Sequence, residues 1–161
     1  MSRTLTSGMT TVTTADVVRP AYFVRMVFDS SVLNIWNGIG NLAFGGNTYT
    51  GTGDLLSISQ ITETSDIQAT GINVSLTGIK TSFIAMAKDQ DYQGRALTVS
   101  FGAFNASGSL ISDPVIVFSG FMDTMTIAEN GQYSTISIAV ENKLISFERA
   151  KVRRYTAEDQ K

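Results

Sequence analysis

Near its C-terminal end the chain reads Tyr133-Ser-Thr-Ile-Ser-Ile-Ala-Val140, and this stretch decides the fold. Apolar and small polar residues alternate along it, as they do in a strand that buries one face. No turn signal separates it from Glu141-Asn-Lys-Leu-Ile-Ser-Phe-Glu-Arg149, and a basic, polar segment follows over residues 150–161. A core strand that leads straight into a charged tail indicates a domain whose C-terminal segment lies outside the folded core.

The residues before this strand predict its hairpin partner. A long strand is expected over 115–126, and Ala128-Glu-Asn-Gly131 carries the Asn-Gly pair that is typical of a tight hairpin turn. A second hairpin turn is expected at 105–109, ahead of a return arm that ends at Asp113-Pro114. Further apolar runs, bounded by glycine and other turn residues, predict strands at 22–28, 32–36, 42–44, 47–49, 55–61, 67–76 and 95–104.

One helix is predicted inside this series of strands. Ile79, Phe83, Met86 and Ala87 are spaced for one face of a short helix over about 81–88. The N-terminal residues are compatible with two structures. Leu5, Met9 and Val12 have helical spacing, but the many threonines disfavour a helix, so residues 1–20 form either an arm or a short helix.

These elements together predict a mainly β protein. The expected fold is an antiparallel β-barrel or sandwich of about nine or ten strands with one short helix. The barrel domain spans 21–149, and residues 150–161 form a basic arm. On the strand at 95–104, Leu97, Val99 and Phe101 are expected to share one face.

Composition argues against most catalytic chemistry. The chain has no cysteine and no histidine. It therefore lacks the commonest general base, the commonest transition-metal ligand and any thiol nucleophile. We expect no enzyme activity, no metal and no cofactor.

The charges are distributed unevenly. Residues 54–141 hold nine acidic and three basic side chains, whereas residues 143–161 hold six basic and three acidic ones. An acidic body with a basic tail suits head-to-tail contact between copies. The alternative is two solvated surfaces of opposite sign.

The basic cluster in the tail is the candidate contact site. It consists of Arg149, Lys151, Arg153, Arg154 and Tyr155. Basic residues beside an aromatic side chain can contact nucleic acid. The chain as a whole is acidic, with a pI of about 5.0, and no nucleic-acid motif accompanies the cluster, so contact with protein is favoured.

Carboxylates are the remaining candidates for chemistry. Asp89, Asp91, Asp113 and Asp123 lie at the predicted ends of elements or on strands. A pair such as Asp91 and Asp123 could run acid-only glycoside hydrolysis or bind a hard cation. Turn and capping roles account for the same positions and are favoured.

Two aromatic residues lie among closely spaced glycines. Trp36 is interpreted as a core anchor or a residue that plugs a small barrel, and the alternative is a carbohydrate-binding platform formed by Trp36 and Tyr49. The glycines at 38–53 do not predict a phosphate-binding loop, because no Lys-Ser/Thr pair follows them.

Targeting signals are not expected. No apolar run approaches the ~20 residues that cross a bilayer, and the first ten residues lack the apolar stretch of a signal peptide. Synthesis in the cytoplasm without membrane insertion is expected.

Short motifs along almost the whole chain resemble one protein family. The motifs are Trp36-Asn-Gly-Ile-Gly40, Tyr49-Thr-Gly-Thr-Gly-Asp-Leu-Leu56, Glu63-Thr64, Leu76-Thr-Gly-Ile79, Asp91-Tyr-Gln-Gly-Arg95, Phe118-Ser-Gly-Phe-Met-Asp123, Val140-Glu-Asn-Lys-Leu144, Glu148-Arg149, Arg153-Arg-Tyr-Thr156 and Asp159-Gln160. In order and spacing they resemble tail proteins of tailed bacteriophages and prophages. That family is encoded among the tail-tip genes and is related to the hub proteins of baseplates and gene transfer agents.

The resemblance implies a structural role in the virion tail. It implies a hub or distal-tail ring that joins the tail tube to tip proteins, assembled as a homo-oligomer of three or six copies. The partners would be neighbouring tail proteins, and DNA would pass through the channel without specific binding. The family has no catalytic residues to carry over. The alternative is a carbohydrate-binding β-sandwich on the tail that contacts the host surface.

Overall fold

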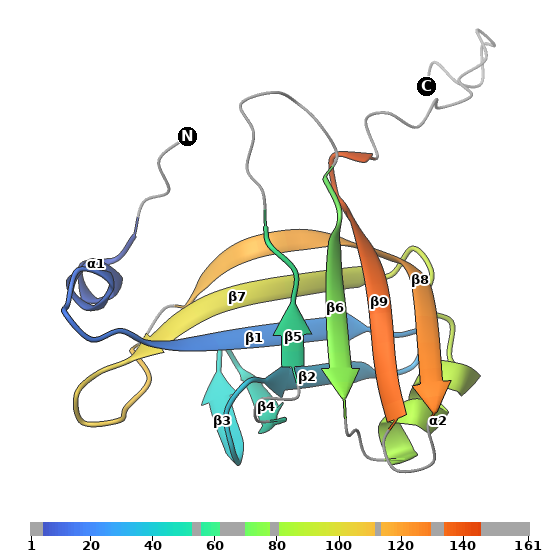
Figure 1. Ribbon diagram of the computed structural model, residues 1–161, viewed down its shortest axis with the longest axis horizontal. Helices are drawn as coiled ribbons and strands as arrows, with labels where there is room; N and C mark the ends of the chain where they lie inside the picture. The colour runs from blue at the N-terminus through green and yellow to red at the C-terminus, as the bar shows by residue number, and fades with distance from the viewer. Residues whose placement is uncertain are drawn as a thin grey trace, which may run out of the picture.

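The computed structural model describes residues 5–52, 56–61, 70–77, 81–111, 114–129 and 134–145 (Figure 1). Within these ranges it contains nine strands in one sheet and two helices. In chain order the elements are α1 (Ser7–Thr13), β1 (Arg19–Val27), β2 (Val32–Trp36), β3 (Asn41–Phe44), β4 (Asn47–Gly51), β5 (Leu56–Ile58), β6 (Ile72–Thr77), α2 (Thr81–Asp89), β7 (Ala96–Phe104), β8 (Val115–Glu129) and β9 (Ser134–Asn142).

The strand order in the sheet is β3-β4-β2-β1-β7-β8-β9-β6-β5. Every neighbouring pair is antiparallel except β2 and β4, which run parallel over two residue pairs. The prediction of a mainly β, mostly antiparallel fold is confirmed. The described strands form an open sheet that ends at β3 and β5, rather than a closed barrel.

The long strand β8 folds this one sheet into two layers. Its first part pairs with β7 and its second part with β9. The register shifts opposite Val99/Ser100 and again between Met122 and Met125. An irregularity of this kind bends a strand and increases its twist. As a result, β6 and β9 cross over β1 and β7 at a steep angle (Figure 1).

The main core fills the space between the two layers. In β9 the residues Ile136, Ile138 and Val140 are buried, which confirms the alternation that predicts this strand. They face a set of buried side chains that come from all the central strands, namely Val24, Met26, Leu33, Ile35, Ile72, Val74, Leu76, Leu97, Val99, Phe118 and Met122. Burying each large aliphatic side chain contributes roughly 1.5–3 kcal/mol, so this face dominates the stability.

The two helices lie near opposite ends of β1 (Figure 1). The prediction of a helix at 81–88 is confirmed by α2, whose Ile84 and Ala87 join the main core. Ser7–Thr13 is also helical, so of the two structures left open for residues 1–20, an arm or a short helix, the structure contains the short helix. There the side-chain oxygen of Thr6 caps the backbone N–H of Met9, and threonine hydroxyls donate to carbonyls one turn earlier.

Several element boundaries differ from those predicted. β1 begins at Arg19 and includes Pro20, whereas the predicted strand begins at residue 22. β5 and β6 are shorter than predicted, and residues 62–69 lie outside the described ranges. The 105–109 turn is confirmed: Asn105 N–H donates to the Ser109 carbonyl at 2.9 Å, and Gly108 has a φ of 76°.

Among the described residues, neither helix is long and apolar enough to cross a membrane.

Candidate assembly surfaces

The predicted contact residues Arg149, Lys151, Arg153, Arg154 and Tyr155 lie outside the described ranges, which end at residue 145. The same holds for Asp113. The structure does define the point from which the C-terminal segment leaves the sheet.

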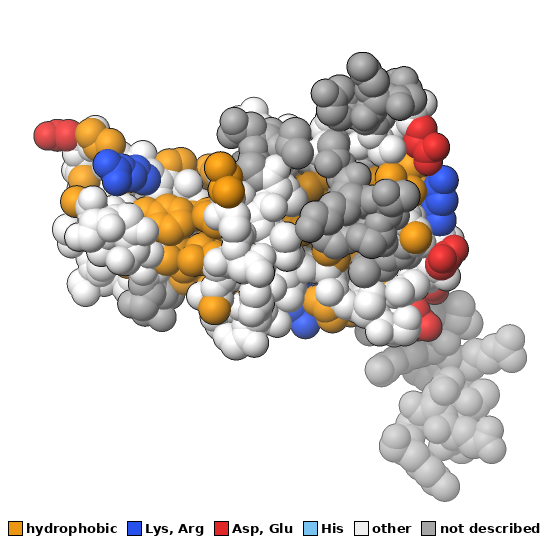
Figure 2. All heavy atoms as spheres, turned by 90° about the horizontal axis from the view of Figure 1, so that it is seen from below, with side chains coloured by type: hydrophobic (Ala, Val, Ile, Leu, Met, Phe, Trp, Pro, Cys, Tyr) orange, Lys and Arg blue, Asp and Glu red, His pale blue; other side chains and the backbone are white. Residues whose placement is uncertain are grey.

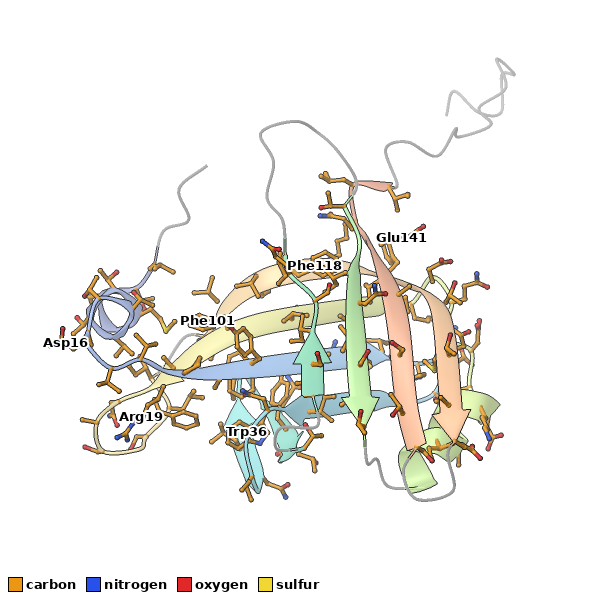
Figure 3. All side chains as sticks on the ribbon, viewed as in Figure 1. Asp16, Arg19, Trp36, Phe101, Phe118 and Glu141 are labelled. Atoms are coloured by element: carbon orange, nitrogen blue, oxygen red, sulfur yellow. The ribbon has the colours of Figure 1, made fainter. Side chains whose placement is uncertain are left out.

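That point is the end of β9, which is fixed firmly against β8. The Asn142 side-chain oxygen accepts a hydrogen bond from the Leu144 N–H at 3.1 Å, and the Lys143 N–H donates to the Ser119 carbonyl at 3.3 Å. A Cβ at residue 120 would lie only 2.1 Å from the Glu141 carbonyl oxygen. Gly120 therefore lets the two strands approach closely where the chain leaves the sheet (Glu141 is labelled in Figure 3).

The turn at 91–95 packs against the same region of β8. Gly94, at a φ of 73°, donates its N–H to the Met122 carbonyl at 2.7 Å. The Tyr92 hydroxyl accepts from the Met125 N–H at 3.3 Å. The motifs at 91–95, 118–123 and 140–144 thus meet around one strand, where they shape backbone rather than present reactive groups.

Three of the four predicted carboxylates, Asp89, Asp91 and Asp123, lie at the α2 end of the molecule. Asp89 and Asp91 belong to the end of α2 and the turn that follows it, and Asp123 accepts from Gln93 and Thr124. Around them, Lys88 pairs with Glu129 at 2.9 Å and Arg95 pairs with Asp29. Among the described residues, no group of three His, Cys, Asp or Glu side chains could hold a metal ion. The hydrogen bonds made here are those of turns and strand ends.

The carbohydrate-platform alternative is wrong, because Trp36 and Tyr49 are buried. They are 7% and 4% exposed, in a second core cluster with Ala21 and Phe23. Phe23 stacks on Trp36 with ring centroids 6.1 Å apart and meets Tyr49 edge-on at 5.1 Å. Burial raises the pKa of the Tyr49 hydroxyl, and the nearby positive charge of Arg25 partly opposes that rise. The interpretation of Trp36 as a core anchor is confirmed, and Figure 3 shows it near β3 and β4.

The sequence did not reveal that four exposed apolar residues lie towards the α1 end, beside the exposed Asp16 and Arg19. Val17 is 72% exposed and Ile116 is 58% exposed, and Val18 and Tyr22 are also exposed. All four belong to the α1 end, since Arg19 pairs with Phe104, Tyr22 with Phe101, and Ser100 with Ile116. Figure 2 shows charged side chains at both ends of the molecule, with more carboxylates at the end away from α1, and a group of hydrophobic side chains on the half towards α1. The strand register places Tyr22 and Ile116 on opposite faces of the sheet, because Tyr22 pairs with Phe101 and Ile116 pairs with the adjacent Ser100.

Phe101 lies towards the α1 end as well, opposite Tyr22. It lies on the same face as Leu97 and Val99, as predicted, but it is only half-buried. Its ring centroid is 5.5 Å from that of Tyr22, which is 37% exposed. The face of β7 that carries these three residues therefore extends beyond the region that β6 and β9 cover.

The fold is similar to that of a solved chain titled "Virion of native gene transfer agent (GTA) particle". The TM-score is 0.64 at 14% sequence identity, and the match covers 93% of this chain and 49% of that chain. This chain therefore spans about half the length of that one. No protein-family model and no curated sequence matches the chain. At this level of identity the similarity shows a common fold: a mainly β domain of the kind found in a gene transfer agent virion.

Proposed function

We propose that this protein is a structural component of a bacteriophage-type virion. The observation that carries the proposal is the fold similarity to a chain of a gene transfer agent virion over 93% of this chain. The described motifs support a structural role, because they form tight turns, strand crossings and an aromatic core. A chain without cysteine or histidine is also poorly equipped for catalysis.

We further propose that it acts at the tail tip or baseplate, as a hub or distal-tail ring that joins the tail tube to tip proteins. The motifs from Trp36 to Gln160 support this position, since their order and spacing resemble that family. The match covers only 49% of the virion chain, so the tail-tip position rests on the motifs.

Charge suggests how copies could meet. The end that carries α2 presents Asp29, Asp89, Asp91, Asp123 and Glu129. The segment 150–161 is basic. Together with Arg149, its residues Lys151, Arg153, Arg154 and Tyr155 would contact the acidic end of a neighbouring copy or another tail protein. Such a contact between different faces of one subunit can close a ring of three or six copies. Acidic residues lining a channel would also repel DNA phosphates, so DNA would pass without specific binding.

An electron-microscopy map of the tail end tests the proposal. We expect this chain in three or six copies around the tail axis, between the tube and the tip proteins. Absence of the chain from purified particles would contradict the structural role. A position on the capsid would contradict the tail-tip assignment while keeping the virion role.

A further inference from the structure

The outer face of β1, β2, β7 and β8, which points away from the main core, carries a polar row with one cation in it. Arg25 of β1 pairs with Asn34 of β2 and with Thr98 of β7, and Thr98 in turn pairs with Ser119 of β8. These four side chains share one face, because residues directly opposite each other in a sheet point to the same side. We call them the Arg25 row.

A second row on the same face is apolar. Two residues along each strand from the Arg25 row, Val27 pairs with Val32 and Ala96 pairs with Phe121. Positions two apart on a strand share a face and lie about 7 Å from each other. Val32 is 43% exposed, and the other three residues are half-buried. We call these four residues the apolar row.

Carboxylates border the far side of the apolar row. Asp123 lies two residues beyond Phe121 on β8; it accepts hydrogen bonds from uncharged side chains and makes no ion pair with a described residue. Asp29 follows the end of β1 and pairs with Arg95, which balances its charge. Glu141 of β9 pairs with Phe121 and adds a carboxylate at the edge of the face. The order across the face is therefore a cation, an apolar row and then carboxylates.

The Arg25 row is incompletely bonded. The Asn34 Oδ1 atom is buried and has no hydrogen-bond partner among the described residues. The Arg25 guanidinium opposite it makes no ion pair within the part of the chain that the structure describes. A buried acceptor without a donor is unfavourable. Because a guanidinium has several N–H donors, Arg25 can bond Asn34 and a carboxylate at the same time. A carboxylate from outside the chain would therefore complete this row.

A second copy supplies that carboxylate from the same face. When two copies meet about a two-fold axis that runs along the apolar row, the Arg25 row of each copy lies over the carboxylates of the other, and the apolar rows cover each other. Four strands about 4.8 Å apart and three rows about 7 Å apart give a face of roughly 400 Å² on each copy. An interface of this size is typical of weak, reversible contacts.

We propose that this face binds the same face of a second copy, with Arg25 of each copy against Asp123 of the other and the two apolar rows between these ion pairs. The contact is isologous, so it joins two copies and then stops. It is distinct from the contact that would close a ring of three or six copies, and it would pair chains that are not yet in a ring. The proposal goes beyond the proposed function and does not depend on a position in a virion.

Charge reversal in the purified full chain tests this contact by sedimentation equilibrium. We expect a monomer–dimer equilibrium that weakens as salt screens the charges. Arg25→Glu and Asp123→Lys should each raise the dissociation constant on the order of tenfold or more, because each places like charges opposite one another. The double variant R25E/D123K should restore the dimer, since the same ion pairs form with their signs exchanged. Arg19→Glu, at the other end of β1, is the matched control and should leave the dimer unchanged.

Disulfide crosslinking gives a second readout, because the chain has no cysteine of its own. A two-fold axis along the apolar row brings residue 27 of one copy close to residue 27 of the other. Val27→Cys should therefore form linked dimers on the order of tenfold faster than Thr126→Cys, an exposed position elsewhere on β8. A chain that stays monomeric at millimolar concentration would overturn the proposal. So would a double variant that dimerises no better than Arg25→Glu, or a Val27→Cys chain that crosslinks no faster than its control.

Discussion

The indole ring of Trp36 lies directly against the backbone of Gly38: a Cβ at residue 38 would come within 1.9 Å of the ring. The indole N–H donates to the Gly40 carbonyl at 3.0 Å, and the Thr52 N–H donates to the Trp36 carbonyl at 2.9 Å. This arrangement explains the glycines of Trp36-Asn-Gly-Ile-Gly40. They let the loop fold back over the ring and bring β4 alongside β2.

The substitution Gly38→Ala should therefore destabilise the fold by about 1–3 kcal/mol, because the new methyl group forces the indole out of its packing. Denaturant unfolding monitored by fluorescence measures it, since Trp36 is the one tryptophan in the chain. Ile39→Ala in the same loop is the matched control, with a side chain that is 91% exposed. Equal stability of the two variants would contradict the packing described for Trp36.

Gly120→Ala should cost more, about 3 kcal/mol or above, because the clash is with backbone. The added Cβ would meet the Glu141 carbonyl oxygen, which belongs to a strand and cannot rotate away. Thermal unfolding by circular dichroism checks this, with Thr126→Ala on the exposed side of β8 as the control. A variant as stable as that control would show that β8 and β9 do not approach so closely at Gly120.

Alkaline unfolding should report on Tyr49. Burial raises the pKa of its hydroxyl above the ordinary value of 10.0. The folded state thus holds this proton more tightly than the unfolded state. The resulting stability is complete below about pH 10 and is lost as the pH rises through the folded pKa.

In Tyr49→Phe we expect stability to fall less steeply above pH 10 than in the parent chain. Tyr22→Phe, at a residue that is 37% exposed, is the control. Parallel pH profiles for Tyr49→Phe and the parent chain would refute a role for Tyr49 burial.

Deleting residues 150–161 should leave the unfolding temperature of the domain almost unchanged, because the described sheet and both helices lie before residue 146. Under the proposed function it should also block incorporation into tails. Arg153→Gln/Arg154→Gln tests whether charge is responsible, and particle composition after purification provides the measurement. Normal incorporation of the truncated chain would remove the assembly role from this segment.

Alanine substitution of Asp91 and Asp123 tests the glycosidase alternative. We expect particles that assemble and infect normally, since both residues belong to turns and strand surfaces. Infectivity assays on the double variant are sufficient. A particle that assembles but no longer infects would revive a catalytic reading of this carboxylate pair.

Local pattern was enough to find most strands. Alternation located β9 because successive side chains of a strand point to opposite faces, so one face can be apolar and the other polar whatever the rest of the chain does. Helical spacing likewise located α2, and glycine and asparagine marked the 105–109 turn. Alternation also assigned Phe101 to the face of Leu97, but it could not say where the covering layer ends.

The sequence by itself determined a mainly β domain with a basic tail and almost no catalytic equipment, because these properties follow from composition and short periods. The tertiary structure alone decided three features: the bend of β8 into two layers, the parallel pairing of β2 with β4, and the packing of α1 beside Ile111. Each depends on contacts between residues far apart in the chain, such as Ser100 with Ile116 or Gly8 with Ile111. The burial of Trp36 was decided in the same way, because its ring is covered by strands that follow it in the chain.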